Sequence, residues 1–169
     1  SVERTALKCL KWGLLFACVD IRIDSANIEI LPTFVGMMLF YASIQVHSHR
    51  TQAEERIKPL FLILAADHFL HWIWEYENGV EGLLRAVIYV YAIYVLTGET
   101  AGRVREYQPD QAGRLESVRV AMVLVHMFSF LVSSYGNVVL NFLAIFAAVG
   151  VWGTFAVVLW GIRPEETME

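Results

Sequence analysis

Residues 138–162 read VVLNFLAIFAAVGVWGTFAVVLWGI, an apolar run without a single charged residue. A helix needs about 20 mostly apolar residues to cross a bilayer, so this stretch is long enough to span one. The whole chain has the same character: 57% of its 169 residues are hydrophobic, 18% are charged, and the mean hydropathy is +0.51. A soluble globule of this size cannot hide so much apolar surface in one core. The composition therefore excludes a soluble enzyme and predicts a membrane protein.

Earlier apolar stretches complete the predicted architecture, an all-α polytopic membrane bundle of six transmembrane helices that forms a single domain over residues 1–169. The predicted spans are Thr5–Val19, Ile28–Val46, Ile57–Trp74, Val80–Leu96, Val118–Ser133 and Val138–Ile162. Pro32 falls in the first turn of the second span, where a missing N–H costs little. The polar stretch 98–116 is predicted to be a long loop.

Positive charge is distributed unevenly between the two ends of this predicted bundle. Of the 13 lysines and arginines, only Arg22 and Arg85 fall on the side of the first, third and fifth connections, and the other 11 fall on the side of the termini. The excess of basic residues on one side predicts that both termini are cytoplasmic. The net charge of -4 and the lack of a basic stripe argue against a nucleic-acid partner.

The third predicted span contains ionisable residues that are costly in lipid. Asp67, His71 and Glu75 follow one another at intervals of four, so they share one helix face, and His68 borders that face. Three hypotheses explain this polar stripe. It binds a divalent metal through Asp67, His71 and Glu75, it is a proton-linked or cation-linked substrate site, or it is a structural hydrogen-bond network.

Candidate partners of the stripe come from other predicted spans. Arg85 enters the fourth span at about the depth of His71, where it is expected to pair with Asp67 or Glu75. His126, near the middle of the fifth span, is expected to face the same site. Tyr89, Tyr91 and Tyr94 lie deep in the fourth span and favour a polar-lined cavity. The chain contains no Walker loop, H-E-x-x-H or G-x-S-x-G motif.

The stretch from Lys11 to Ala42 resembles the opening of many small uncharacterised bacterial polytopic membrane proteins. It contains KWGLLF, then DIRI from Asp20, then NIEILPTFVG ending at Gly36, with Thr33 where the "ILPDFVG" pattern has an acid. The resemblance implies a multi-pass protein of the bacterial plasma membrane and implies no activity. The overall arrangement is also similar, more loosely, to the substrate-binding subunits of energy-coupling-factor transporters, although their A-x-x-x-A contact motif is missing from the first helix.

These observations predict a protein that binds or transports a small solute or cation through an outward-facing polar site within the membrane. Its ligand-binding residues would be Asp67, His68, His71, Glu75, Arg85 and His126, with a divalent metal as the candidate cofactor. The expected partners are the lipid bilayer, the small molecule or cation, and other membrane subunits. The alternatives are a membrane-embedded, metal-dependent enzyme that acts on a lipid-linked substrate, and a structural or regulatory membrane subunit.

Overall fold

The computed structural model describes residues 2–18, 22–23, 28–29, 32–74 and 79–164 and is all-α apart from one two-residue strand pair. The helices are α1 (Arg4–Cys18), α2 (Thr33–Gln45), α3 (Gln52–Ile73), α4 (Gly79–Val104), α5 (Pro109–Tyr135) and α6 (Val138–Gly161). The strands β1 (Arg22–Ile23) and β2 (Ile28–Glu29) pair in antiparallel fashion between α1 and α2.

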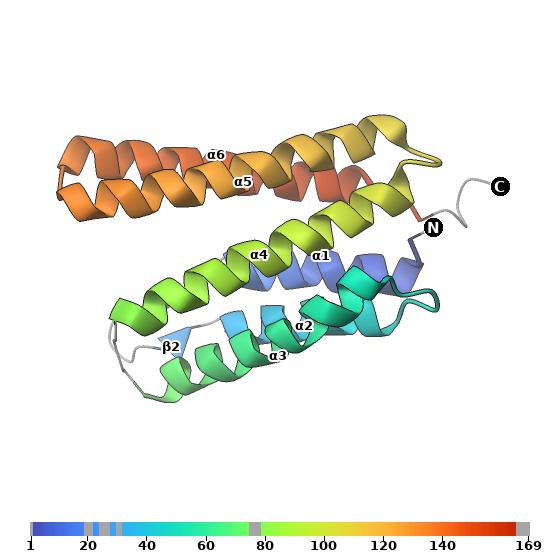
Figure 1. The fold of residues 1–169 in the computed structure, drawn as a ribbon, viewed down its shortest axis with the longest axis horizontal. Coiled ribbons are helices and arrows are strands. Elements are labelled where there is room, and N and C mark those ends of the chain that lie inside the picture. The colour runs from blue at the N-terminus through green and yellow to red at the C-terminus, as the bar shows by residue number, and fades with distance from the viewer. Residues whose placement is uncertain (1, 19–21, 24–27, 30–31, 75–78, 165–169) are drawn as a thin grey trace.

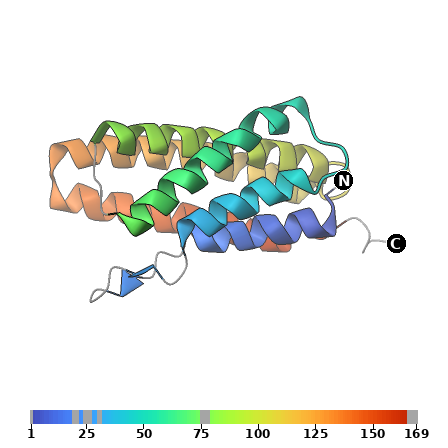
Figure 2. The same ribbon diagram turned by 90° about the horizontal axis from the view of Figure 1, so that it is seen from below.

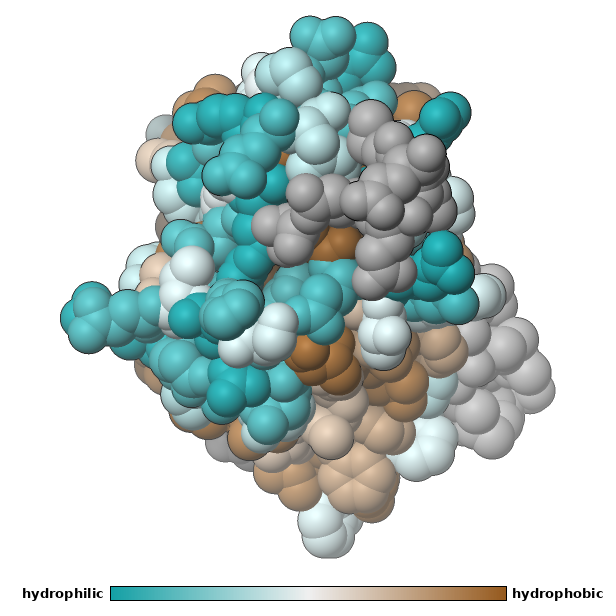
Figure 3. All heavy atoms as spheres, turned by 90° about the vertical axis from the view of Figure 1, so that its right-hand side faces the viewer, coloured by the Kyte–Doolittle hydropathy of each residue, from teal (hydrophilic) through white to brown (hydrophobic). Residues whose placement is uncertain are grey.

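Each helix packs against its neighbours in sequence, and α6 also contacts α1, so the six helices close into a ring (Figures 1 and 2). The start of α1, the end of α6 and the α2–α3 and α4–α5 connections lie at one end of the bundle, which is called the terminal end here. The strands, the end of α3, the start of α4 and the α5–α6 connection lie at the other, called the distal end. Figure 3 looks onto the terminal end, where hydrophilic residues cover much of the surface.

Three helices, α4, α5 and α6, are long and apolar enough to cross a membrane, as expected of a membrane protein. Large hydrophobic side chains on their outer faces stay exposed, among them Leu124, Phe130, Phe142, Phe146 and Val157. The buried hydroxyls of Thr97 and Thr100 bond to backbone carbonyls one turn earlier in α4, so they need no water. Helices α1 and α2 have only 15 and 13 residues, and α3 has a strongly charged first half.

Helices α1 and α2 touch almost backbone to backbone where Gly13 meets Gly36. A Cβ atom on Gly36 would lie 2.9 Å from the Gly13 carbonyl oxygen and 3.0 Å from the Ala17 nitrogen. Backbone atoms cannot move aside as a flexible side chain can, so this crossing requires a residue without a side chain. Close packing through small residues is typical of helix pairs within membranes.

Three sequence predictions about helix boundaries are wrong, and one of them is the start of α3, which lies at Gln52 and not at Ile57. The second helix begins at Thr33 and not at Ile28, because Ile28 and Glu29 form β2 and Pro32 adopts an extended backbone just before the helix; residues 30–31 lie outside the described residues. A proline disfavours helical backbone in the residue before it.

The third error concerns the predicted long loop over 98–116, most of which is helical. Helix α4 continues to Val104, and α5 already begins at Pro109. The end of α4 buries Ala101 and Val104, the start of α5 buries Ala112 and Leu115, and charged residues such as Arg105, Asp110 and Arg114 are exposed. The high polarity therefore reflects an amphipathic helix extension and not a loop.

Candidate functional site

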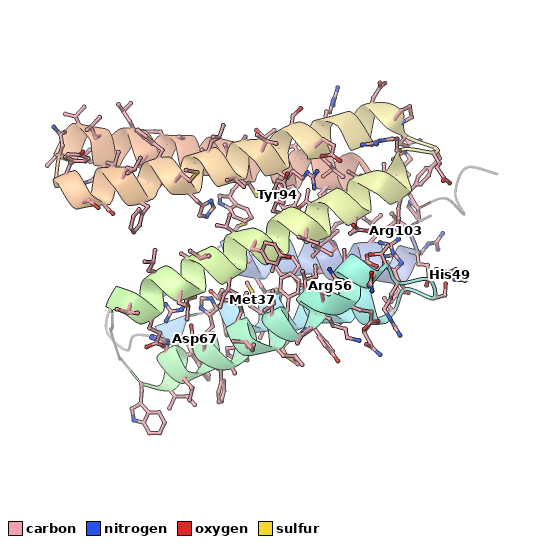
Figure 4. The ribbon with its side chains drawn as sticks, viewed as in Figure 1. Met37, His49, Arg56, Asp67, Tyr94 and Arg103 are labelled. Carbon is pink, nitrogen blue, oxygen red and sulfur yellow. The ribbon has the colours of Figure 1, made fainter. Side chains whose placement is uncertain are left out.

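Helices α3 and α4 bring together a group of four polar residues towards the distal end, which we call the Asp67 group: Asp67, His71, Glu81 and Arg85. Figure 4 shows Asp67 near that end, on the side of α3 that faces α4. Asp67 and His71 are one turn apart on α3, and Glu81 and Arg85 are one turn apart on α4. All four side chains are partly buried, with exposed fractions between 20% and 31%.

Arg85 is the centre of this group. Its Nε donates to Asp67 Oδ2, and its Nη2 lies 2.8 Å from Nε2 of His71 and 3.7 Å from Oε1 of Glu81. One guanidinium thus reaches all three other members. This matches the predicted pairing of Arg85 with Asp67.

The hydrogen bonds around His71 favour one neutral tautomer. Nδ1 lies 2.9 Å from the backbone oxygen of Asp67, which can only accept, so Nδ1 carries the proton. Nε2 then accepts from the Arg85 guanidinium, which can only donate. Glu81 Oε1 lies 3.6 Å from the same Nε2, just beyond hydrogen-bonding distance.

The Asp67 group contains two carboxylates and one guanidinium. Arg85 lies within ion-pairing distance of both Asp67 and Glu81. Asp67, His71 and Glu81 each offer a ligand atom, and these atoms all lie within 4.8 Å of one another. Carboxylate oxygens and imidazole nitrogens are ordinary ligands of zinc and other divalent metals. The group can therefore hold one more positive charge, provided that Arg85 makes room for it.

The structure places the other predicted site residues differently. His68 forms no hydrogen bond or ion pair within the described ranges, although it adjoins Asp67 in sequence. Glu75, the third predicted metal ligand, lies outside the described residues. Among the described residues, the third candidate ligand beside Asp67 and His71 is Glu81. Glu81 was not among the site residues predicted from the sequence. Its spacing of four from Arg85 was the signal that could have identified it.

His126 does not join the Asp67 group, contrary to the prediction that it faces the stripe. Its Nδ1 bonds to the Met122 carbonyl at 2.7 Å, and its ring lies against Tyr89 and Trp152, with centroids 6.4 and 5.9 Å away. These residues line a small pocket between α4, α5 and α6, together with Tyr94 and Arg119, among others. The cavity predicted from the deep tyrosines thus lies in a different place from the polar stripe.

A second ionic group near the terminal end was not predicted. Arg103 of α4 donates both terminal nitrogens to Glu54 of α3 and one of them also to the His49 carbonyl at 2.9 Å. Glu54 is fully buried, and its carboxylate also accepts from the Thr51 backbone nitrogen, which completes a capping box at the start of α3. The sequence signal was Thr51 followed three residues later by Glu54.

Two titratable residues add to this end, His47 in the α2–α3 connection and Glu3 just before α1. Burial, and then the positive charge of Arg103, hold the pKa of His47 below its ordinary value, against the opposing effect of Glu54 and Glu3. Hydrogen bonds from the Ser48 side chain and backbone hold the pKa of Glu3 below its ordinary value. Glu3 therefore ties the start of α1 to this connection as a carboxylate.

Comparison with known proteins adds no relative to this description. No protein-family model, no curated protein and no solved structure matches the chain significantly. The functional argument therefore rests on the geometry of the Asp67 group and on the membrane-spanning character of the helices.

Proposed function

We propose that this protein is a multi-pass plasma-membrane protein that binds or moves a small cation or solute at the Asp67 group. In this proposal all six helices cross the membrane, both termini are cytoplasmic, and the group opens towards the outside. The alternation of helix direction around the ring and the excess of basic residues at the terminal end support that orientation.

One observation carries the proposal: Arg85 contacts every member of a three-residue set whose ligand atoms already converge. In this view the guanidinium is a tethered counter-ion that occupies the site until another cation competes for the same oxygens and nitrogen. Charged residues buried in helical membrane proteins usually mark a substrate or ion pathway. In this proposal the two carboxylates, Asp67 and Glu81, supply the attraction for the incoming cation.

Calorimetric titration of the purified protein with Zn²⁺ tests this proposal. Zn²⁺ is a suitable probe because carboxylate oxygen and imidazole nitrogen are its ligands. We expect Asp67→Asn and His71→Ala to weaken binding at least about tenfold, because each removes one of only three ligands. Arg85→Gln removes the competing charge, so it should tighten binding about tenfold.

His126→Ala serves as the matched control, because His126 is a second buried histidine whose contacts lie with Tyr89 and Trp152. Its zinc affinity should equal that of the wild type. Equal affinity in the wild type, Asp67→Asn and His71→Ala would show that the Asp67 group only braces α3 against α4. Weaker binding in Arg85→Gln would contradict the role of Arg85 as a competitor.

A further inference from the structure

Helix α1 carries a basic face that the proposed cation site does not use. Arg4, Lys8 and Lys11 follow at intervals of four and three, so they share one side of the helix. The core side of α1 is formed by other residues, namely Ala6, Leu7, Leu10, Gly13 and Leu14. Arg4 and Lys8 are exposed, and exposed Trp12 follows Lys8 by one turn.

Contacts with α6 set the level of this face relative to the membrane. Lys11 Nζ donates to the Ile162 carbonyl at 3.2 Å and lies 5.9 Å from the ring centroid of Trp160. Because α6 is long enough to cross the membrane and ends at Gly161, its last turn belongs at a membrane surface. The Lys11 ammonium therefore lies at headgroup level. Lys8 and Arg4 lie successively closer to the terminal end, which is largely hydrophilic (Figure 3).

These basic side chains lack acidic partners within the part of the chain that the structure describes. Arg4, Lys8 and Lys11 take part in no ion pair there. By contrast, each of five other cations pairs with a glutamate: Arg50, Lys58, Arg103, Arg105 and Arg119. The acidic Glu165, Glu166 and Glu169 lie outside the described residues.

We infer that this basic face, defined by Arg4, Lys8 and Lys11 with Trp12 and Trp160 beside it, binds the headgroup of an anionic phospholipid. Lysine and arginine would meet the phosphate, because a negative surface attracts basic residues at this level. Tryptophan rings are enriched at the same depth, where an apolar body and a polar N–H are both accommodated. The inference needs α6 to span the membrane but is independent of the Asp67 group.

Thermal unfolding in micelles of a neutral detergent tests this inference. Phosphatidylglycerol should raise the unfolding midpoint more than phosphatidylcholine with the same acyl chains. In Arg4→Gln/Lys8→Gln, the phosphatidylglycerol concentration that gives half of this shift should rise tenfold or more, since each basic residue contributes about fivefold. Arg56→Gln/Arg114→Gln is the matched control, because it removes two exposed cations that form no ion pair among the described residues. Its response should equal that of the wild type.

Three results would overturn the inference. The Arg4→Gln/Lys8→Gln protein could respond like the wild type, or both double variants could lose the response equally, which would show an effect of overall charge. Soluble glycerol phosphate could also give the full shift, which would show a general anion effect. The single variant Lys8→Gln, at an exposed position, provides the same comparison if the double variant does not fold.

Discussion

Replacement of Arg103 by alanine should lower the free energy of unfolding by about 3–5 kcal/mol, because it leaves the fully buried carboxylate of Glu54 without its counter-ion. Among the described residues, the carboxylate would keep only the Thr51 backbone nitrogen as a hydrogen-bond partner. Denaturant or thermal unfolding in detergent, followed by circular dichroism, measures this loss.

Arg105→Ala is the matched control for this prediction. Arg105 follows Arg103 by two residues and pairs with Glu116, but its side chain is 62% exposed. An exposed ion pair contributes at most about 1 kcal/mol, so this variant should be nearly as stable as the wild type. Adding Glu54→Gln to Arg103→Ala should restore part of the stability, because the amide removes the buried charge. An equal loss in Arg103→Ala and Arg105→Ala would contradict the account of the buried pair.

The second large effect is expected at the Asp67 group. Arg85→Gln leaves Asp67 and Glu81 together without a cation, and Asp67→Asn leaves Arg85 with a weaker partner. Each single change should therefore destabilise the protein, and the double variant should lose less than the sum of the two. We expect a coupling energy of about 1–3 kcal/mol, as found for contacting residues in one ionic network. The four unfolding free energies in detergent give this value directly.

A pair of residues without shared contacts supplies the control for that cycle. His126→Ala combined with Arg85→Gln should be additive, because His126 contacts Tyr89 and Trp152 instead of Arg85. Additivity of Asp67→Asn and Arg85→Gln would show that these two side chains do not interact in the folded protein. Arg85 would then not be the counter-ion of the Asp67 group.

Hydropathy was sufficient to predict the order of the six helices, since each contains an apolar stretch. Hydropathy failed to predict helix in the segments that contain many charged residues. The frequent charges of residues 98–116 predict a loop, whereas Ala101 and Val104 are buried on α4 and Ala112 and Leu115 are buried on α5. The start of α3 was placed too late for a similar reason, although Thr51 and Glu54 form a recognisable capping box.

The polar site was predictable only in part. A charged residue in an apolar helix needs a partner, and that rule pointed to Asp67, His71 and Arg85. The sequence contains no information about which side of α5 faces α3, so His126 was assigned to the wrong neighbours. Glu81 was missed because its role depends on the contact between α3 and α4, which only the tertiary structure shows.

Accessibility of single cysteines to a membrane-impermeant maleimide tests the central claim, a membrane-spanning bundle whose Asp67 group opens to the outside. In a background with Cys9 and Cys18 replaced by serine, Ser134→Cys places a thiol at the distal end and Glu106→Cys places one at the terminal end. The account predicts that intact cells are labelled at position 134 and not at 106, and that lysis exposes position 106. Labelling of intact cells at position 106 and not at 134 would contradict it.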